Sequence, residues 1–198
     1  MKTVNLVNIS KRYGKIFILK NINFRFESGK CYLIIGANGA GKSTLLKLIN
    51  KMIFPTEGDV KLNILKIGYV PDKNVLPQSI TVDKFLFTMT KIKKENFINT
   101  IMLMKYFNIY MERYKKISHL SKGMIQKVLI IQAFLGNPDI LIFDEALNGL
   151  DTVMQEKLIN LIKLVKDKDK IIIITSHYPS YYDEIVDMRL KVEDGKIN

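Results

Sequence analysis

A glycine-rich loop between an apolar run and a helical pattern carries the clearest chemistry in this sequence. It reads Gly-Ala-Asn-Gly-Ala-Gly-Lys-Ser-Thr over residues 36–44, and the apolar run before it covers residues 31–35. A phosphate-binding P-loop requires this strand–loop–helix setting, because the glycines let successive backbone N–H groups point into one concavity. We therefore predict that Lys42 reaches the β- and γ-phosphates of a nucleotide and that the Ser43 hydroxyl binds Mg²⁺.

Two adjacent carboxylates form a second chemical motif. Four apolar residues, 140–143, lead into Asp144 and Glu145. Ligands bind at the carboxyl ends of the strands in an open α/β sheet, so we predict that Asp144 holds Mg²⁺ through water. Glu145 would polarise the attacking water as a general base. A strand that ends in solvated acids is common, and it is the P-loop that makes the catalytic interpretation strong.

The elements that must position these residues alternate between strands and helices. We predict a single α/β domain over residues 1–198, with a nucleotide-binding core and an antiparallel β portion from residues 1–78 and 130–198. A helical insertion is predicted over residues 79–129, beginning at Thr81 as a helix N-cap. Strands are expected near residues 4–9, 22–26, 31–35, 60–64, 67–70, 140–143, 171–174, 189–192 and 196–197. The last third of the chain returns to α/β alternation, with helices from about residue 122 to 135 and from 154 to 165.

The chain is strongly basic, with 31 Lys+Arg against 19 Asp+Glu and a formal net charge of +12. Much of the excess falls between residues 84 and 127. A solvated Lys-rich helical surface, contact with anionic lipid headgroups and nucleic-acid binding all fit this charge. The first is favoured, because neither aromatic residues interleaved with basic ones nor a nucleic-acid motif accompanies the charge.

Cysteine use and hydropathy bear on the compartment. The one cysteine, Cys31, excludes an internal disulfide and fits a reducing compartment. No apolar run approaches the roughly 20 residues that span a bilayer, and residues 1–12 do not form a cleavable signal sequence. We expect a soluble protein that meets a membrane only through a partner.

The order of these motifs resembles the nucleotide-binding ATPase subunit of an ABC (ATP-binding cassette) transporter over essentially the whole chain. Residues 120–124, Leu-Ser-Lys-Gly-Met, resemble the LSGGQ signature of that family, and residues 148–151, Asn-Gly-Leu-Asp, resemble its D-loop. Many NTPases contain a P-loop, whereas a signature between the P-loop and the paired carboxylates is specific to this family. The resemblance implies a P-loop NTPase of the ABC ATPase type, with a mainly parallel core sheet.

The resemblance also implies roles for individual residues. Tyr13 would stack on adenine, and His177 after the run 171–176 matches the switch histidine. The catalytic residues would be Glu145, His177 and Lys42. ATP would be bound by Tyr13, Gly36, Asn38, Gly39, Ala40, Gly41, Lys42, Ser43 and Thr44, and the metal by Ser43, Asp72 and Asp144. The signature, which would face the ATP of the partner protomer, would consist of Ser121, Lys122, Gly123 and Met124. The D-loop aspartate would be Asp151.

Several positions depart from the family pattern. Asp72 stands where the family has a glutamine; a carboxylate can still bind Mg²⁺, but it adds negative charge and lacks the amide donor. Lys122 and Met124 replace a glycine and a glutamine of the signature, and Ala146 replaces the proline that follows the catalytic glutamate. We expect the ATP site to tolerate these changes, and Asp72 is the one that alters the charge beside the phosphates.

The function implied by the resemblance is ATP hydrolysis, with ATP and Mg²⁺ as cofactors, that powers a separate membrane permease. Two such ATPase protomers would pair head-to-tail around ATP, as a homodimer or a heterodimer, at the inner face of the cell membrane. The signature and Asp72 lean towards exporter-type subunits, and no specific nucleic-acid partner is expected. Alternatives are a soluble ABC ATPase of iron–sulfur assembly, translation or DNA maintenance, and a nucleotide-gated module with little hydrolysis, against which Glu145 argues.

Overall fold

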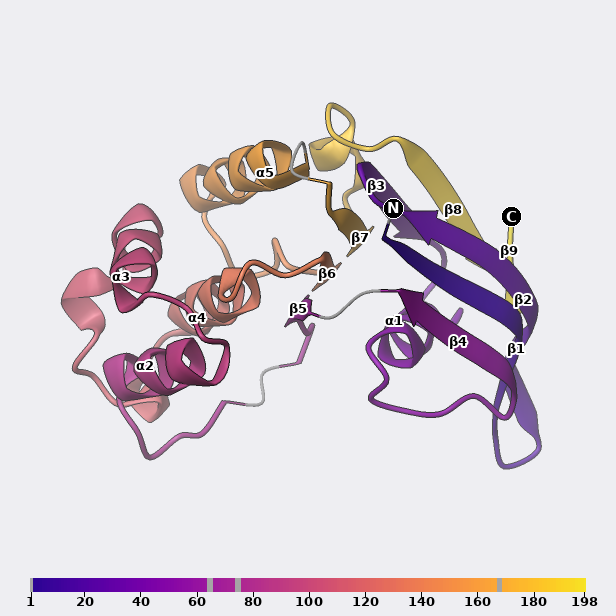
Figure 1. The fold of residues 1–198 in the computed structure, drawn as a ribbon, viewed down its shortest axis with the longest axis horizontal. Helices are drawn as coiled ribbons and strands as arrows, with labels where there is room; N and C mark the ends of the chain where they lie inside the picture. Colours follow the sequence, from indigo (N-terminus) through magenta and orange to yellow (C-terminus); the bar gives the residue numbers. More distant parts are fainter. Residues whose placement is uncertain (1, 64–65, 74–75, 167–168) are drawn as a thin grey trace.

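Two β-sheets and a group of helices make up the fold, as Figure 1 shows. The computed structural model describes residues 2–63, 66–73, 76–166 and 169–198. Within those residues a six-stranded sheet has the order β5-β6-β7-β3-β8-β9, and a three-stranded sheet has the order β2-β1-β4. The strands are β1 (Thr3–Tyr13), β2 (Ile16–Glu27), β3 (Lys30–Ile35), β4 (Glu57–Asn63), β5 (Ile67–Val70), β6 (Ile140–Asp144), β7 (Ile171–Thr175), β8 (Met188–Glu193) and β9 (Lys196–Ile197).

The larger sheet is parallel from β5 to β8, and β9 pairs antiparallel with β8. The smaller sheet is antiparallel throughout. This confirms the predicted α/β fold with a mainly parallel core sheet and an N-terminal antiparallel portion. Ile64, which the sequence placed at the end of the strand that is now β4, lies outside the described residues.

The central strands are buried on both faces. In β6, Leu141 and Phe143 belong to one hydrophobic cluster, whereas Ile140 and Ile142 belong to another. Successive side chains of a strand point to opposite faces, so a strand between two cores must be apolar at every position. The continuous apolar runs of β6 and β7 meet this requirement, and they carry the polar residues of the site at their carboxyl ends.

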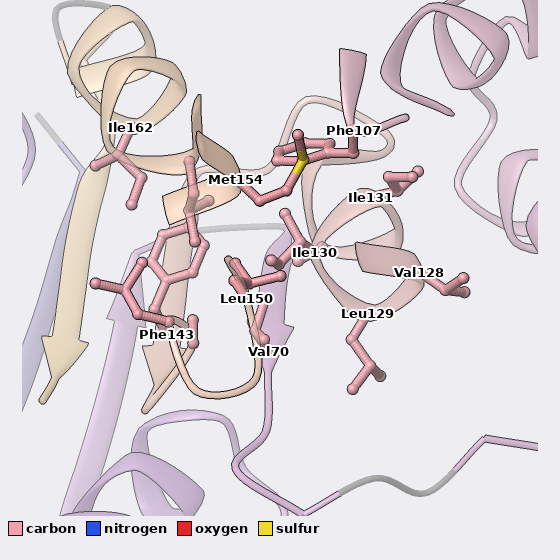
Figure 2. Close-up of a cluster of buried hydrophobic side chains, with 14 of the residues drawn as sticks. Val70, Phe107, Val128, Leu129, Ile130, Ile131, Phe143, Leu150, Met154 and Ile162 are labelled. Carbon is pink, nitrogen blue, oxygen red and sulfur yellow. The ribbon is translucent and has the colours of Figure 1, made fainter. Parts of the chain in front are cut away.

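Helices cover one face of the parallel sheet. They are α2 (Val82–Ile92), α3 (Phe97–Tyr106), α4 (Lys122–Phe134) and α5 (Thr152–Lys166). Figure 2 shows Phe143 from the sheet, Ile130 from α4 and Met154 from α5 in the same buried cluster. Figure 1 shows α2, α3 and α4 grouped at the end of the molecule opposite the antiparallel sheet. The helical insertion predicted from the sequence therefore shares its core with β5 and β6.

The other face of the parallel sheet packs against α1 (Lys42–Ile49) and the antiparallel sheet. Leu45 and Leu46 of α1 are fully buried there. An aromatic cluster joins the two sheets, with the Phe26 and Tyr32 ring centroids 4.9 Å apart in an edge-on arrangement. The Tyr32 hydroxyl accepts a hydrogen bond from the Glu27 backbone N–H at 2.8 Å, so its polar end is paired despite its burial.

Helix caps define where the helical elements begin. The Thr81 side chain accepts a hydrogen bond from the Lys84 backbone N–H, which confirms it as the N-cap of α2. Lys94 has a φ of +52° just after α2, and Asn96 caps α3. The helical region after residue 80 is thus divided into short helices. No helix in the described part of the chain is long and apolar enough to cross a membrane.

Phe143 provides a test of the core that lies under the helices. We expect Phe143→Ala to lower the free energy of unfolding by about 3–5 kcal/mol, because it removes a fully buried ring from a packed cluster. Urea unfolding followed by circular dichroism measures this loss. Phe54→Ala is the matched control, because the Phe54 side chain is 82% exposed and its removal should cost less than about 0.5 kcal/mol. Equal losses in the two variants would contradict this assignment of the core.

Candidate functional site

The glycine-rich loop wraps around its own lysine. It connects β3 to α1, and the Lys42 ammonium donates to the backbone oxygens of Gly36 at 2.8 Å and Ala37 at 3.1 Å. A Cβ at Gly36 would lie 2.4 Å from the Val192 carbonyl oxygen, so only glycine fits there. Gly41, with a φ of +107°, leads into α1. The loop therefore places the lysine at the N-terminus of α1, where the partial positive charge of the helix favours an anion.

The carboxylate pair lies at the end of β6. Asp144 is 3% exposed and Glu145 is 8% exposed. The Ser43 hydroxyl of α1 lies 3.4 Å from Asp144 Oδ1 and donates a hydrogen bond to it. The P-loop serine and the aspartate are therefore neighbours, although 101 positions separate them in the sequence.

Glu145 is held in an unusual backbone conformation. Its φ is +53°, in the left-handed region, and its backbone N–H donates to the carbonyl oxygen of Thr175 at 3.2 Å. Its Oε2 accepts a hydrogen bond from the His177 backbone N–H at 3.0 Å, and His177 Nε2 lies 3.5 Å from Oε1. The turn at Glu145 therefore directs the carboxylate towards the start of the segment that follows β7.

Burial raises the pKa of the Glu145 carboxyl above its ordinary value. The His177 backbone N–H and imidazole and the Lys42 ammonium act in the opposite direction, and the Asp144 carboxylate adds to the rise. A raised pKa makes a carboxylate a stronger proton acceptor, which suits a general base. This environment fits the role that the sequence predicted for Glu145.

One cavity of about 310 Å³ brings together most of the predicted site residues. Its lining comes from the β1–β2 hairpin, the P-loop, the segment after β5, the end of β6 and the segment after β7. The lining residues are Tyr13, Ile18, Asn38, Gly39, Gly41, Lys42, Ser43, Thr44, Asp72, Asp144, Glu145 and His177. Asp72 therefore lies at the same cavity as the other predicted metal ligands.

The residues that resemble the signature and the D-loop do not line this cavity. Ser121 caps α4 by accepting a hydrogen bond from the Met124 backbone N–H, and Asp151 caps α5 by accepting one from the Met154 backbone N–H. A Cβ at Gly123 would lie 2.5 Å from the Gly149 carbonyl oxygen, so these two stretches pack against each other. They form a separate, solvent-facing region of the same molecule.

The oxygen atoms around the cavity fit Mg²⁺ bound together with a nucleotide. Ser43, Asp72 and Asp144 offer one hydroxyl and two carboxylates. Among the described residues, no group of three or more His, Cys, Asp and Glu side chains is arranged to hold a metal ion by itself. Mg²⁺ takes one or two carboxylates and completes its shell with substrate phosphates and water, so the residues present suit a metal that arrives with its substrate.

Two residues near the site were not singled out by the sequence. Thr175 is the last residue of β7, and its hydroxyl donates to Asp144 Oδ1 at 2.6 Å. A polar residue that ends an apolar strand was the available signal. Gln126, buried in α4, donates to the Ala146 carbonyl oxygen at 2.9 Å and so fixes the segment after the carboxylates. Nothing in the local pattern of α4 distinguishes this glutamine.

Comparisons with known proteins show the family of this chain. The family described as "ABC transporter" matches residues 19–148. The zinc import ATP-binding protein ZnuC of Buchnera aphidicola is 36% identical over 183 residues, which cover 89% of this chain and 75% of that protein. The lantibiotic transport ATP-binding protein SrtF of Streptococcus pyogenes is 29% identical over 98% of this chain and 88% of that protein. A solved ATP-binding subunit of an ABC transporter superposes with a TM-score of 0.91 at 25% identity, covering 98% of this chain and 87% of that one.

The burial of Glu145 predicts a pH dependence of stability. Because its pKa is higher in the folded protein than in the unfolded chain, the folded state binds the proton more tightly, and the protein loses stability as the pH rises from the ordinary carboxyl pKa through the raised pKa of the folded state. Glu145→Gln removes this titration, so the variant should be more stable than the wild type at pH 7, with the difference much reduced at about pH 4. Urea unfolding in EDTA at both pH values measures it.

Glu184→Gln is the matched control for this prediction. The Glu184 side chain is 84% exposed, so its removal should change the free energy of unfolding by the same small amount at both pH values. A stability gap for Glu145→Gln that does not grow between pH 4 and pH 7 would contradict the assigned burial of the carboxyl.

Proposed function

The chain belongs to the ABC transporter family of ATP-binding subunits and is an ATPase, and from this premise we propose that it powers a separate membrane permease through ATP-dependent head-to-tail dimerisation. The observation that carries the proposal is the cavity that joins the P-loop lysine, three oxygen-bearing metal ligands and the buried Glu145. The signature-like stretch lies outside this cavity, which supports a second protomer as the source of the missing contacts.

The polar and aromatic side chains that line the cavity divide the proposed reaction between them. Lys42 and the P-loop N–H groups bind the β- and γ-phosphates, and Tyr13, whose side chain is half exposed, stacks on adenine. Ser43, Asp144 and Asp72 hold Mg²⁺, which when bound neutralises phosphate charge. Glu145 would accept the proton of the attacking water, and His177, whose Nε2 lies 3.5 Å from Glu145 Oε1, would donate a hydrogen bond to the γ-phosphate.

The proposed dimer supplies a second set of anion-binding groups. Ser121 and Gly123 lie at the N-terminus of α4, where the helix carries partial positive charge. Lys122 is exposed, and its side-chain stem runs over Gly149, with its Cγ 3.5 Å from where a Cβ on that glycine would be. These groups would face the γ-phosphate bound to the partner, with Met124 beside them and Asp151 linking the two ATP sites.

The helical insertion provides the proposed surface for the permease. Ile92, Ile98 and Met102 on or beside α2 and α3 are all more than half exposed. Exposed apolar side chains among lysines suit a partner that lies at an anionic membrane surface, on the inner face of the cell membrane. One relative is named for zinc import and another for lantibiotic transport, so what the two names have in common is transport. Export by this chain remains a prediction.

The dimer can be tested with a variant that retains ATP. Glu145→Gln keeps the phosphate-binding groups and removes the general base, so it should form a dimer in Mg·ATP that size exclusion with light scattering detects. Adding Ser121→Arg should abolish that dimer by placing bulk at the proposed contact with the partner's phosphates. Thr88→Arg, on the exposed side of α2, is the matched control and should leave dimerisation intact. A dimer that forms equally well without nucleotide would refute the mechanism.

The permease can be tested by what changes the ATPase rate. Membranes that contain the cognate permease should alter hydrolysis severalfold at near-physiological salt, whereas duplex DNA and structured RNA should not. Nucleic-acid contacts through lysines would appear as binding that weakens steeply with salt. Hydrolysis stimulated by RNA or DNA, with no membrane protein recovered, would reject the transporter assignment and favour a soluble ABC ATPase.

A further inference from the structure

We propose that Thr175 is a positioning residue of the ATP site, whose hydroxyl fixes the Asp144 carboxylate and the Glu145 backbone in the arrangement that hydrolysis needs. This inference rests on the proposed function, because it concerns the same carboxylates. Thr175 lies outside the sequence motifs from which the ATP site was predicted.

The contacts of the Thr175 hydroxyl support this role directly. Thr175 is fully buried and pairs with Asp144 in the parallel register of β6 and β7. Its Oγ1 donates to Asp144 Oδ1 at 2.6 Å and accepts from the Glu145 backbone N–H at 3.2 Å. A hydroxyl has one donor and two acceptor positions, so both hydrogen bonds can exist at once. One side chain therefore holds two consecutive residues of the site.

The second of these bonds acts on a strained backbone. Glu145 has a φ of +53°, a conformation that is unfavourable for a residue with a side chain and persists where its surroundings fix it. The carbonyl oxygen and the hydroxyl of Thr175 both accept from the Glu145 N–H, each at 3.2 Å. This shared hydrogen bond keeps the carboxylate turned towards His177.

The hydrogen bond from Thr175 to Asp144 is one of several contacts that surround this carboxylate. Ser43 donates to Oδ1 from 3.4 Å, so Thr175 at 2.6 Å is the closer of the two. Tyr69 of β5 lies near Asp144 on the other side of β6; burial and then the charge of this carboxylate raise the pKa of its phenol. Gln132 of α4 fixes the Tyr69 carbonyl oxygen at 2.7 Å. The Asp144 carboxylate therefore accepts hydrogen bonds from β7 and from α1, and Thr175 makes the shorter one.

The test removes the hydroxyl while it keeps the shape. Thr175→Val should lower kcat for Mg·ATP about 10- to 100-fold, which corresponds to a lost hydrogen bond to a charged group. The KM for ATP should change less than about threefold, because the P-loop that binds the phosphates is untouched. Thr175→Ser keeps the hydroxyl and should restore kcat to within about threefold of the wild type.

Thr100→Val is the matched control. Thr100 is also fully buried, and its hydroxyl is hydrogen-bonded to that of Thr90 at 2.7 Å, but it lies in α3, away from the cavity. It should lower the melting temperature without changing kcat. A kcat for Thr175→Val that equals that of Thr100→Val, or a Thr175→Ser variant as impaired as Thr175→Val, would overturn the proposal.

A measurement without metal or nucleotide separates this inference from the proposed function. The melting temperatures of Thr175→Val, Asp144→Asn and the double variant are measured in EDTA. The change in melting temperature of the double variant should differ clearly from the sum of the changes in the two single variants, because the two side chains are in contact. The Thr100→Val and Asp144→Asn shifts should add. Additive shifts for Thr175 would overturn the inference even if the protein is an active ATPase, whereas an inactive wild type with a coupled pair would count against the proposed function alone.

Discussion

Two consecutive buried carboxylates at the end of one strand are the constraint on which this site depends. Asp144 and Glu145 are both less than a tenth exposed, and burying charge is costly unless partners compensate. Hydroxyl groups from the P-loop helix and from β7 donate to Asp144, whereas Glu145 accepts a hydrogen bond from a backbone N–H and lies beside an imidazole. The surrounding polar groups come from distant parts of the chain, so the site exists only in the complete fold.

The parallel sheet is what delivers those groups to one place. β5, β6, β7 and β3 are adjacent and parallel, so Asp72, Asp144, His177 and the P-loop all follow strands that end at the same edge. Apolar residues on both faces of these strands leave the carboxyl edge as the place where polar groups can collect. The helices on one face and the antiparallel sheet on the other hold these strands in place, while Lys42 and Ser43 at the start of α1 and Tyr13 of β1 add their side chains to the cavity.

The sequence predicted the site features that are formed by neighbouring residues. It did not predict the contacts that depend on how one strand is aligned with the next. The P-loop, the carboxylate pair and the Thr81 cap are each formed by a few consecutive residues. Their types and spacing in the sequence are therefore enough to predict them. The bond between Thr175 and Asp144 joins residues 31 positions apart, and only the pairing of β6 with β7 creates it. The left-handed φ of Glu145 and the bond from Gln126 to Ala146 likewise arise from packing.

The charge around the cavity gives the proposed division of the site between two protomers a physical reason. Its lining holds the carboxylates Asp72, Asp144 and Glu145 but, among the described residues, Lys42 is the sole lysine. ATP brings further negative charge, so a single protomer gains most from a nucleotide that carries a divalent cation. Asp72, where the family has a neutral glutamine, increases this need. Lys122, where the family has glycine, adds a positive charge to the surface that would face the partner's phosphates. The two departures have opposite charge, and pairing two copies would bring them to the same ATP.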